Sequence, residues 1–381
     1  MDRVARTLKK AIENSGKSLL LLGPRQTGKS TLIRSLRPDI EIDLSHEAEY
    51  LAFARNPREL DERLEARKVK TVFIDEVQRL PGLTNTVQHW IDRTDIRFFL
   101  TGSSARKLRR GKANLLPGRV LSYEMRPLTV EELNDEYPLR QVLETGLMPG
   151  IFTCEDPRER EELLSAYAAI YLKEEIQSEA LVKNIEGFSR FIFVAAACSG
   201  EFLDLSKLAN QADIPRQSAV RFFEILEDTL IVRRLHAFAK TERRRLIKHP
   251  KYYFFDTGVL NGMLRNFSAS ADRAGKLFEH FVANQLFDIA SNRRKPLQLS
   301  TFRTENDAEV DFIVEWDAEV FAIEVKASAN VGKSDLTGFR SFSEVYRKRH
   351  RKMILTNGHV EKKMDDVFIL PVSKGLKAIF G

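Results

Sequence analysis

Residues 18–31 read SLLLLGPRQTGKST, and this stretch decides the first fold of the chain. The four leucines after Ser18 predict a short buried strand. Gly23 to Ser30 then fit the pattern G-x-x-x-x-G-K-[ST], and the helical pattern TLIRSL follows at once. Backbone N–H groups at a helix N-terminus attract anions, so this order of strand, glycine-rich loop and helix predicts a cradle for nucleotide phosphates. The alternative is a chance Gly/Lys loop, which the flanking strand and helix disfavour.

Two side chains of this loop have distinct predicted roles. Lys29 is expected to reach the β and γ oxygens of ATP, and Ser30 to ligate Mg²⁺. The residues predicted to contact the nucleotide are Gly23, Pro24, Arg25, Gln26, Thr27, Gly28, Lys29, Ser30 and Thr31.

A second apolar segment, TVFIDE (71–76), predicts a strand that ends in adjacent acids. Asp75 is placed to hold the water shell of Mg²⁺, and Glu76 to orient and deprotonate the attacking water. A third strand, IRFFLTGSS (96–104), carries Thr101, Ser103 and Ser104 at its polar end. One of these hydroxyls is a candidate sensor of the γ-phosphate, and simple turn residues are the alternative.

A further strand at IEIDLS (40–45) completes the predicted parallel α/β sheet, whose ligand lies at the carboxyl ends of the strands. Arg119, in the loop LPGRV, is the first candidate for an arginine supplied in trans to a neighbouring subunit, and Arg106 is the second. An ordinary surface arginine is the alternative for both.

Composition supports a folded protein of two or three domains. The chain has 381 residues, of which 43% are hydrophobic and 30% charged, and its net charge is +7. Cys154 and Cys198 show no zinc-site spacing, which predicts unpaired thiols in a reducing cytoplasm. The charged opening does not resemble a signal peptide, and no apolar run is long enough to span a membrane. Two basic runs, 233–251 and 347–352, predict either a solvated surface or one that follows phosphates.

The middle of the chain is predicted as a helical lid or linker (131–188), followed by a winged helix-turn-helix (189–268). Its longer helix presents Arg216 and Arg221, together with the acids Glu224 and Asp228. These acids argue against reading of base sequence in a major groove, and a protein-interaction module is equally compatible. A basic wing is the stronger candidate for phosphate contacts: Arg243, Arg244 and Arg245.

The C-terminal region (269–381) combines a helix bearing Glu279 with strands bearing Asp311, Glu324 and Lys326. Residues i and i+2 of a strand share a face, so Glu324 and Lys326 point the same way, and Asp311 joins them if the two strands pair. Carboxylates bind Mg²⁺, and a lysine beside them can position water for attack on a phosphodiester. Glu279, Asp311 and Glu324 are therefore candidate metal ligands, with Lys326 catalytic. The alternative is a salt-bridged strand pair in a decayed nuclease-like domain.

The segments GPRQTGKST, VFIDEVQRLP, FFLTGSSARKL and LPGRV resemble a large prokaryotic family of AAA-type ATPases with a C-terminal domain of unknown function. In that family the C-terminal region resembles the PD-(D/E)xK nuclease superfamily, whose motif maps onto Asp311, Glu324 and Lys326, with Glu279 as the helix acid. Val310 stands where the superfamily motif has proline. The resemblance implies ATP hydrolysis and a homo-oligomer in the form of a ring. It implies DNA cleavage less directly.

Three functional hypotheses follow for an α/β chain with an ATPase domain at 1–130. The first is an ATP-hydrolysing, DNA-processing enzyme whose nuclease-fold domain also cuts. The second is a DNA-dependent ATPase or translocase, acting on branched or broken DNA, whose nuclease fold only binds. The third is a nucleotide-switched regulator that binds partner proteins. The basic runs favour the first two, with recognition of DNA structure rather than sequence.

Overall fold

The computed structural model describes residues 4–103, 116–171, 185–238, 249–328 and 330–381. These fall into two compact units: residues 1–128 with 228–231, and residues 129–227 with 232–381. The predicted division into 1–130, 131–188, 189–268 and 269–381 is finer than these two units and stays a prediction. Predicted residues Ser104, Arg106, Arg243, Arg244 and Arg245 lie outside the described residues.

The first unit is a parallel sheet of five strands in the order β2-β3-β4-β1-β5, which confirms the predicted α/β fold. Its strands are β1 (Ser18–Leu22), β2 (Ile40–Asp43), β3 (Thr71–Asp75), β4 (Arg97–Gly102) and β5 (Val120–Glu124). Its helices are α1 (Thr7–Ser15), α2 (Lys29–Arg34), α3 (Glu47–Arg55), α4 (Glu59–Glu65), the 3₁₀ turn η1 (Val77–Arg79) and α5 (Leu83–Arg93).

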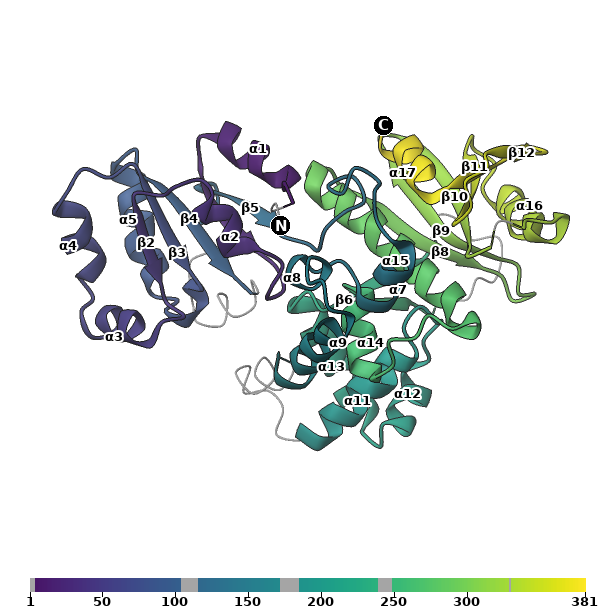
Figure 1. The fold of residues 1–381 in the computed structure, drawn as a ribbon, viewed down its shortest axis with the longest axis horizontal. Coiled ribbons are helices and arrows are strands. Elements are labelled where there is room, and N and C mark those ends of the chain that lie inside the picture. The colour runs from purple at the N-terminus through teal and green to yellow at the C-terminus, as the bar shows by residue number, and fades with distance from the viewer. Residues whose placement is uncertain (1–3, 104–115, 172–184, 239–248, 329) are drawn as a thin grey trace. The chain divides into compact units, whose positions relative to one another are not determined.

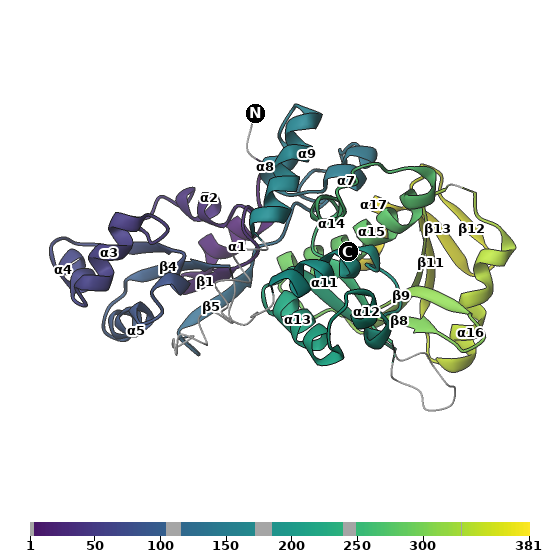
Figure 2. The same cartoon turned by 90° about the horizontal axis from the view of Figure 1, so that it is seen from below.

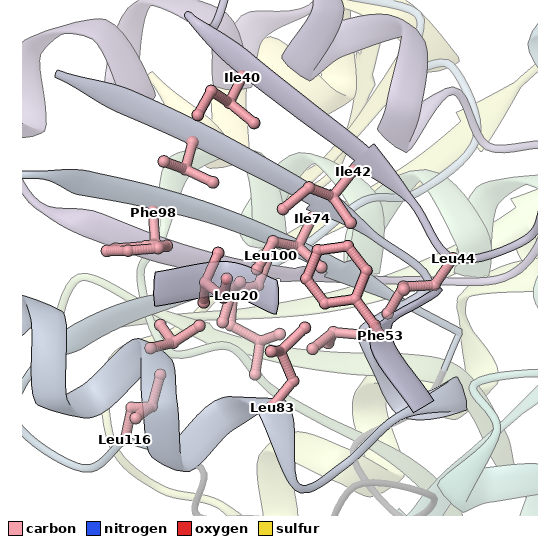
Figure 3. Packing of buried hydrophobic residues seen from close by; sticks show 14 of the residues in the cluster. Leu20, Ile40, Ile42, Leu44, Phe53, Ile74, Leu83, Phe98, Leu100 and Leu116 are labelled. Carbon is pink, nitrogen blue, oxygen red and sulfur yellow. The ribbon is translucent and has the colours of Figure 1, made fainter. Parts of the chain in front are cut away.

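Both faces of this sheet are covered (Figure 1), which explains why every residue of β1 is buried. Leu20 and Leu22 point into a core with side chains of α3, α4 and α5 (Figure 3). Leu19 and Leu21 point the other way, into a core with α1 and α2. The order of strands places β4 between β1 and β3. The polar end of β4 therefore lies between the phosphate loop and the acids that follow β3.

The second unit begins with helices and ends in a mixed sheet. Its helices are α7 (Leu139–Thr145), α8 (Pro149–Phe152), α9 (Pro157–Ala166), η2 (Tyr167–Tyr171), α11 (Ile185–Ala197), α12 (Leu205–Gln211), α13 (Arg216–Asp228), α14 (Thr257–Leu264), α15 (Ala271–Arg293), η3 (Lys333–Leu336), α16 (Thr337–Val345) and α17 (Val372–Phe380). Its strands are β6 (Val232–Ala237), β7 (Lys251–Phe254), β8 (Gln298–Arg303), β9 (Glu309–Trp316), β10 (Glu319–Lys326), β11 (Arg351–Thr356), β12 (Lys362–Met364) and β13 (Val367–Pro371).

These eight strands form one sheet in the order β12-β13-β11-β10-β9-β8-β6-β7. Its apolar residues pack against Phe339 and Phe342 of α16, which Figure 2 shows beside β8 and β9. Strand β6 pairs with β7 in an antiparallel hairpin and with β8 in parallel. The hairpin predicted as the wing of a winged helix is therefore continuous with the C-terminal sheet. Helices α11, α12 and α13 precede it in the predicted order.

Candidate functional site

The phosphate loop connects β1 to α2 and is held in a tight curve. Gln26 and Gly28 adopt positive φ angles of 61° and 93°, a conformation that glycine tolerates best. The ammonium group of Lys29 is buried and donates to the carbonyl oxygens of Gly23 at 2.8 Å and Pro24 at 2.9 Å. The hydroxyl of Thr27 also donates to Pro24 O, at 2.8 Å. The loop is thus ordered around its lysine, with the N-terminus of α2 directly behind it.

The predicted acids lie at the carboxyl end of β3. Asp75 is buried and accepts a hydrogen bond from the hydroxyl of Thr101 on β4. Glu76 follows with a left-handed backbone (φ 57°), and its N–H donates to Thr101 Oγ1 at 3.3 Å. A positive φ at a glutamate carries a conformational cost, and such residues concentrate at functional sites. Thr101 thus fixes both acids, a role beyond that of a turn residue.

Gln78, in the turn after Glu76, contacts the candidate base, and the sequence analysis did not predict this residue as part of the site. Its amide nitrogen donates to the carboxylate of Glu76 and lies 3.4 Å from the hydroxyl of Ser103. Ser103 is almost fully buried. The signal in the sequence is a glutamine two residues after Glu76. A pattern within one strand does not reveal that this glutamine contacts the end of β4.

The residues of this site fit Mg²⁺ by donor chemistry. The Ser30 hydroxyl and the Asp75 carboxylate are hard oxygen ligands of the kind that Mg²⁺ prefers. Asp75 also faces a cation, since Arg34 Nη2 lies 4.0 Å from its Oδ2. The sequence did not predict this contact. Arg34 bonds Glu41 at 2.5 Å and Asp43 at 3.3 Å on β2. These contacts anchor the end of α2 to the edge of the sheet.

Arg119 lies just before β5 and pairs with Asp92 of α5 at 2.6 and 3.0 Å. Asp92 is an acceptor within the same chain, so Arg119 has to leave it in order to reach a neighbouring subunit. Its predicted role in trans stays a prediction.

In the second unit, the structure confirms that β9 and β10 pair, and this brings the predicted C-terminal residues together. Asp311 Oδ2 accepts the N–H of Val325 at 2.8 Å. Lys326 Nζ lies 3.9 Å from Glu324 and 3.5 Å from Asp335. Asp311 and Glu324 are both less than 10% exposed. Burial and the charge of Glu279 raise the pKa of Asp311 above its usual value. Burial and the charge of Asp311 likewise raise the pKa of Glu324.

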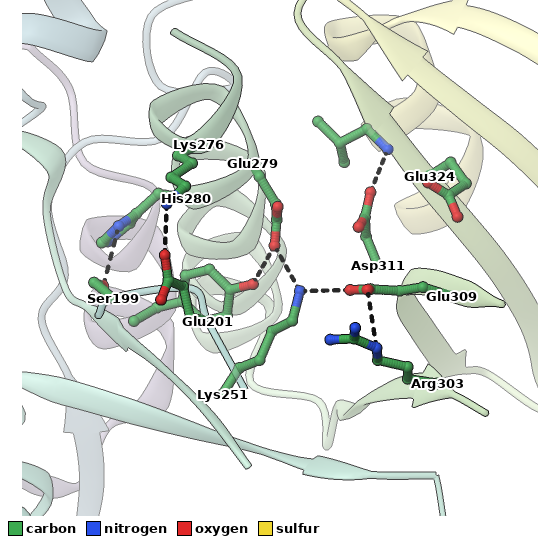
Figure 4. A network of polar contacts seen from close by, with 12 residues as sticks. Ser199, Glu201, Lys251, Lys276, Glu279, His280, Arg303, Glu309, Asp311 and Glu324 are labelled. Carbon is green, nitrogen blue, oxygen red and sulfur yellow. Dashed lines mark hydrogen bonds and ion pairs between the residues drawn. The ribbon is translucent and has the colours of Figure 1, made fainter. Parts of the chain in front are cut away.

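Lys251 is the unexpected member of this cluster. Its ammonium group bridges Glu279, at 3.1 Å, and Glu309, at 2.9 Å (Figure 4), and its side chain is 3% exposed. Burial opposes its charge, but Glu279, Asp311 and Glu309 together raise the pKa of Lys251 above its usual value. Glu279 also accepts from the hydroxyl of Tyr253 at 2.6 Å. One carboxylate oxygen of the predicted metal ligand is thus already bonded twice within the protein.

Among the described residues, no group of three or more His, Cys, Asp or Glu side chains is arranged to hold a metal ion. As they are placed, the predicted ligands Glu279, Asp311 and Glu324 do not form such a group, and Lys251 already bonds one oxygen of Glu279. The predicted metal site and cleavage by this domain stay predictions.

The basic run 233–251 is not the continuous surface that sequence alone indicated. Arg233 is buried against Asp288 at 2.5 Å, and Lys251 is buried as described. Strand alternation explains the difference, because every second residue of β6 and β7 faces the helix α15. Arg216 and Arg221 of α13 are exposed, as are Arg347, Lys348 and Arg349 of the second basic run. Both cysteines are free thiols, and both are partly exposed.

The parallel five-strand sheet and the phosphate loop give the first unit a P-loop-like fold. Residues 15–134 match the model of an AAA domain family. Residues 137–270 and 274–374 match two domains of unknown function, DUF8612 and DUF4143. This order agrees with the resemblance drawn from the sequence, although neither of the two later families carries a described activity.

The chain is 28% identical over 321 residues to an uncharacterized protein of Mycobacterium tuberculosis, covering 82% of this chain and 70% of that protein. An uncharacterized protein of Haemophilus influenzae is 21% identical over 93% of this chain and 92% of its own length. Among solved structures, the ORC1 protein of Aeropyrum pernix in complex with DNA is 13% identical, covers 71% of this chain and 91% of its own, and gives a TM-score of 0.26. That score is too low to bear on function. No helix among the described residues has the length and apolar character needed to cross a membrane.

Proposed function

We propose that the chain hydrolyses ATP at the carboxyl edge of the parallel sheet in its first unit. The observation that carries this is the meeting of three strands at Thr101. Its hydroxyl bonds Asp75 at the end of β3 and the N–H of Glu76 directly after that strand, and β4 also borders the strand that leads into the phosphate loop. A loop for phosphates, a ligand for Mg²⁺ and a base for water therefore occupy one edge.

Each residue has a defined part in the reaction. The loop N–H groups and Lys29 hold the β- and γ-phosphates and offset the charge that develops on them. Mg²⁺, when bound through Ser30 and Asp75, supplies further charge neutralisation. Glu76 accepts a proton as the water oxygen bonds to the γ-phosphorus and the bond to the β–γ bridging oxygen breaks. The products are ADP and inorganic phosphate.

The test is steady-state ATP turnover by the full chain with Mg²⁺, together with binding of ATP. We expect Lys29→Ala to weaken nucleotide binding and stop turnover. We expect Glu76→Gln to stop turnover while ATP still binds, because the carboxamide keeps the shape of the side chain and lacks the base. Glu65→Gln, at an exposed position of α4, is the matched control. Full turnover by Glu76→Gln would refute the assignment of the base.

We also propose that DNA is the partner to which this hydrolysis responds, through phosphate contacts and not through base reading. Support comes from the helices α11 to α13 followed by the β6–β7 hairpin, the element order of a winged helix, and from the exposed Arg216 and Arg221. Glu224 and Asp228 on the same helix are exposed too and disfavour a major-groove fit. Binding of this kind falls steeply with salt.

Single-stranded, duplex, forked and four-way DNAs, tested for stimulation of ATP turnover and for cleavage, discriminate between the functional hypotheses. We expect stimulation, strongest for forked or four-way DNA and reduced by Arg216→Glu with Arg221→Glu. No stimulation by any DNA would favour the nucleotide-switched regulator. The contacts of Lys251 favour a nuclease-like domain that binds without cutting, so we expect no cleavage with Mg²⁺ or Mn²⁺. Cleavage abolished by Lys326→Ala would overturn that part. Sedimentation with and without nucleotide tests the homo-oligomer.

A further inference from the structure

Gln78 lies where the catalytic base, the end of β4 and the phosphate loop come together. Its Nε2 donates to the carboxylate of Glu76 and lies 3.4 Å from Ser103 Oγ. Gly102, next to Ser103, accepts the N–H of Gly23 on its carbonyl oxygen at 3.3 Å. One amide therefore connects Glu76 to the strand that supports the first residue of the phosphate loop.

The orientation of this amide is fixed by its neighbour. Oxygen and nitrogen of a glutamine are assigned from their partners, and a carboxylate accepts hydrogen bonds only. The reverse orientation would place Oε1 of Gln78 against the carboxylate of Glu76, so that two acceptors would face each other. Nε2 must therefore point at Glu76.

This orientation leaves Gln78 Oε1 buried, with no hydrogen-bond partner among the described residues. A buried polar atom without a partner opposes folding, so stability does not account for the arrangement. Room for the amide exists because residue 102 has no side chain: a Cβ on Gly102 would stand 2.7 Å from Gln78 Oε1. The glutamine is thus accommodated at a cost, at the one point where it reaches both Glu76 and Ser103.

We propose that Gln78 is a positioning residue of the hydrolytic site. Its amide holds the carboxylate of Glu76 at a fixed position relative to Ser103, at the end of β4. The inference rests on the proposed ATP hydrolysis and on Glu76 as its base. One oxygen of Glu76 is occupied by Gln78, which leaves the other to accept the proton of the attacking water. Displacement of Ser103 by the γ-phosphate would be transmitted to Glu76 through the same amide, so the base would respond to the nucleotide state.

The test compares Gln78→Leu and Gln78→Glu in the full chain, with Gln211→Glu at an exposed position of α12 as the charge control. We expect Gln78→Leu to lower kcat by about 10- to 100-fold, as small misplacements of catalytic groups do. KM and ATP affinity should be unchanged, which shows that the fold is intact. Gln78→Glu puts a second carboxylate beside the base, so the rising limb of the kcat–pH profile should move to higher pH.

A double-mutant cycle completes the test. If the amide couples Ser103 to Glu76, the losses in kcat caused by Gln78→Leu and Ser103→Ala should not add. A Gln78→Leu variant within twofold of the wild-type kcat, while Glu76→Gln is inactive, would overturn this inference and leave the proposed function intact. Parallel loss of ATP binding in Gln78→Leu would also overturn it, as a structural role predicts. Absence of turnover in the wild-type protein would remove the proposed function, and the inference with it.

Discussion

The hydroxyl of Thr101 donates a hydrogen bond to the carboxylate of Asp75, across the boundary between the parallel strands β4 and β3. The same oxygen accepts the N–H of Glu76 at 3.3 Å. The threonine itself is completely buried. A residue from the central strand therefore orients the candidate magnesium ligand and the backbone of the candidate base together.

Thr101→Val should weaken the response to Mg²⁺ more than it affects ATP binding. Valine has nearly the same shape but cannot hold Asp75, and loss of a group that orients a metal ligand costs about 10- to 100-fold in metal affinity or activity. We expect the Mg²⁺ concentration that gives half-maximal turnover to rise by about that factor. Thr101→Ser, which keeps the hydroxyl, is the control. An unchanged Mg²⁺ titration in Thr101→Val would show that Asp75 is oriented by other contacts.

Gly102→Ala should reproduce the effect of Gln78→Leu without replacing a polar side chain. The added methyl would meet Gln78 Oε1 at 2.7 Å, so the amide must shift from its position beside Glu76. We expect kcat to fall by about tenfold or more with ATP affinity retained. Gly82→Ala is the matched control, because a Cβ on Gly82 has open space around it. Equal turnover by the two variants would mean that the amide can shift and still hold the base.

The sequence predicted those parts of the fold and site that are encoded locally. The phosphate loop is one continuous segment, and a run of apolar residues is sufficient to mark each buried strand, so Lys29, Asp75 and Thr101 were placed from pattern alone. Gln78 was missed because its partners lie on two elements, one of them 25 residues further along the chain. Tertiary pairings of that kind leave no periodicity in the sequence.

For Lys251 and Arg233 the sequence pattern led to a wrong prediction, again because their partners lie on other elements. A dense run of basic residues is typical of solvated surface, and both alternatives for the run 233–251 placed it on the surface. The structure buries these two against Glu279, Glu309 and Asp288, because β6 and β7 extend the C-terminal sheet and face α15. A basic run therefore does not indicate a surface where the fold supplies acidic partners for its side chains, as it does for these two.

Lys251→Met should destabilise the second unit strongly. The substitution leaves the half-buried Glu279 and Glu309 beside the buried Asp311 without their shared cation, and removing one partner of a buried ion pair costs about 3–5 kcal/mol. The free energy of unfolding from urea titration measures this loss, with the exposed Lys348→Met as control. Stabilisation of Lys251→Met, but not of the wild type, by Mn²⁺ would show that the carboxylates accept a metal once the lysine is gone. A loss below about 1 kcal/mol would show that the carboxylates are neutralised in another way.

His280 should make the stability of the second unit depend on pH. It is buried on α15 and donates through Nε2 to the carbonyl oxygen of Phe254 at 2.6 Å. Burial lowers the pKa of His280 from 6.5 to about 4, although the Phe254 carbonyl favours the charged form. Between these values the unfolded chain takes up a proton that the folded chain does not. Stability contributed by neutral His280 is therefore complete above about pH 6.5 and is lost as the pH falls towards 4.

From pH 7.5 to pH 5 this single group should lower the free energy of unfolding by about 2 kcal/mol, from the 1.36 kcal/mol that each pKa unit represents. His280→Gln keeps a donor for the Phe254 carbonyl and cannot titrate, so its unfolding free energy should fall by about 2 kcal/mol less than that of the wild type over the same interval. His359→Gln, at an exposed position, should follow the wild type. Identical pH dependence in His280→Gln and the wild type would mean that His280 is protonated in the folded chain, and that the Phe254 carbonyl outweighs burial.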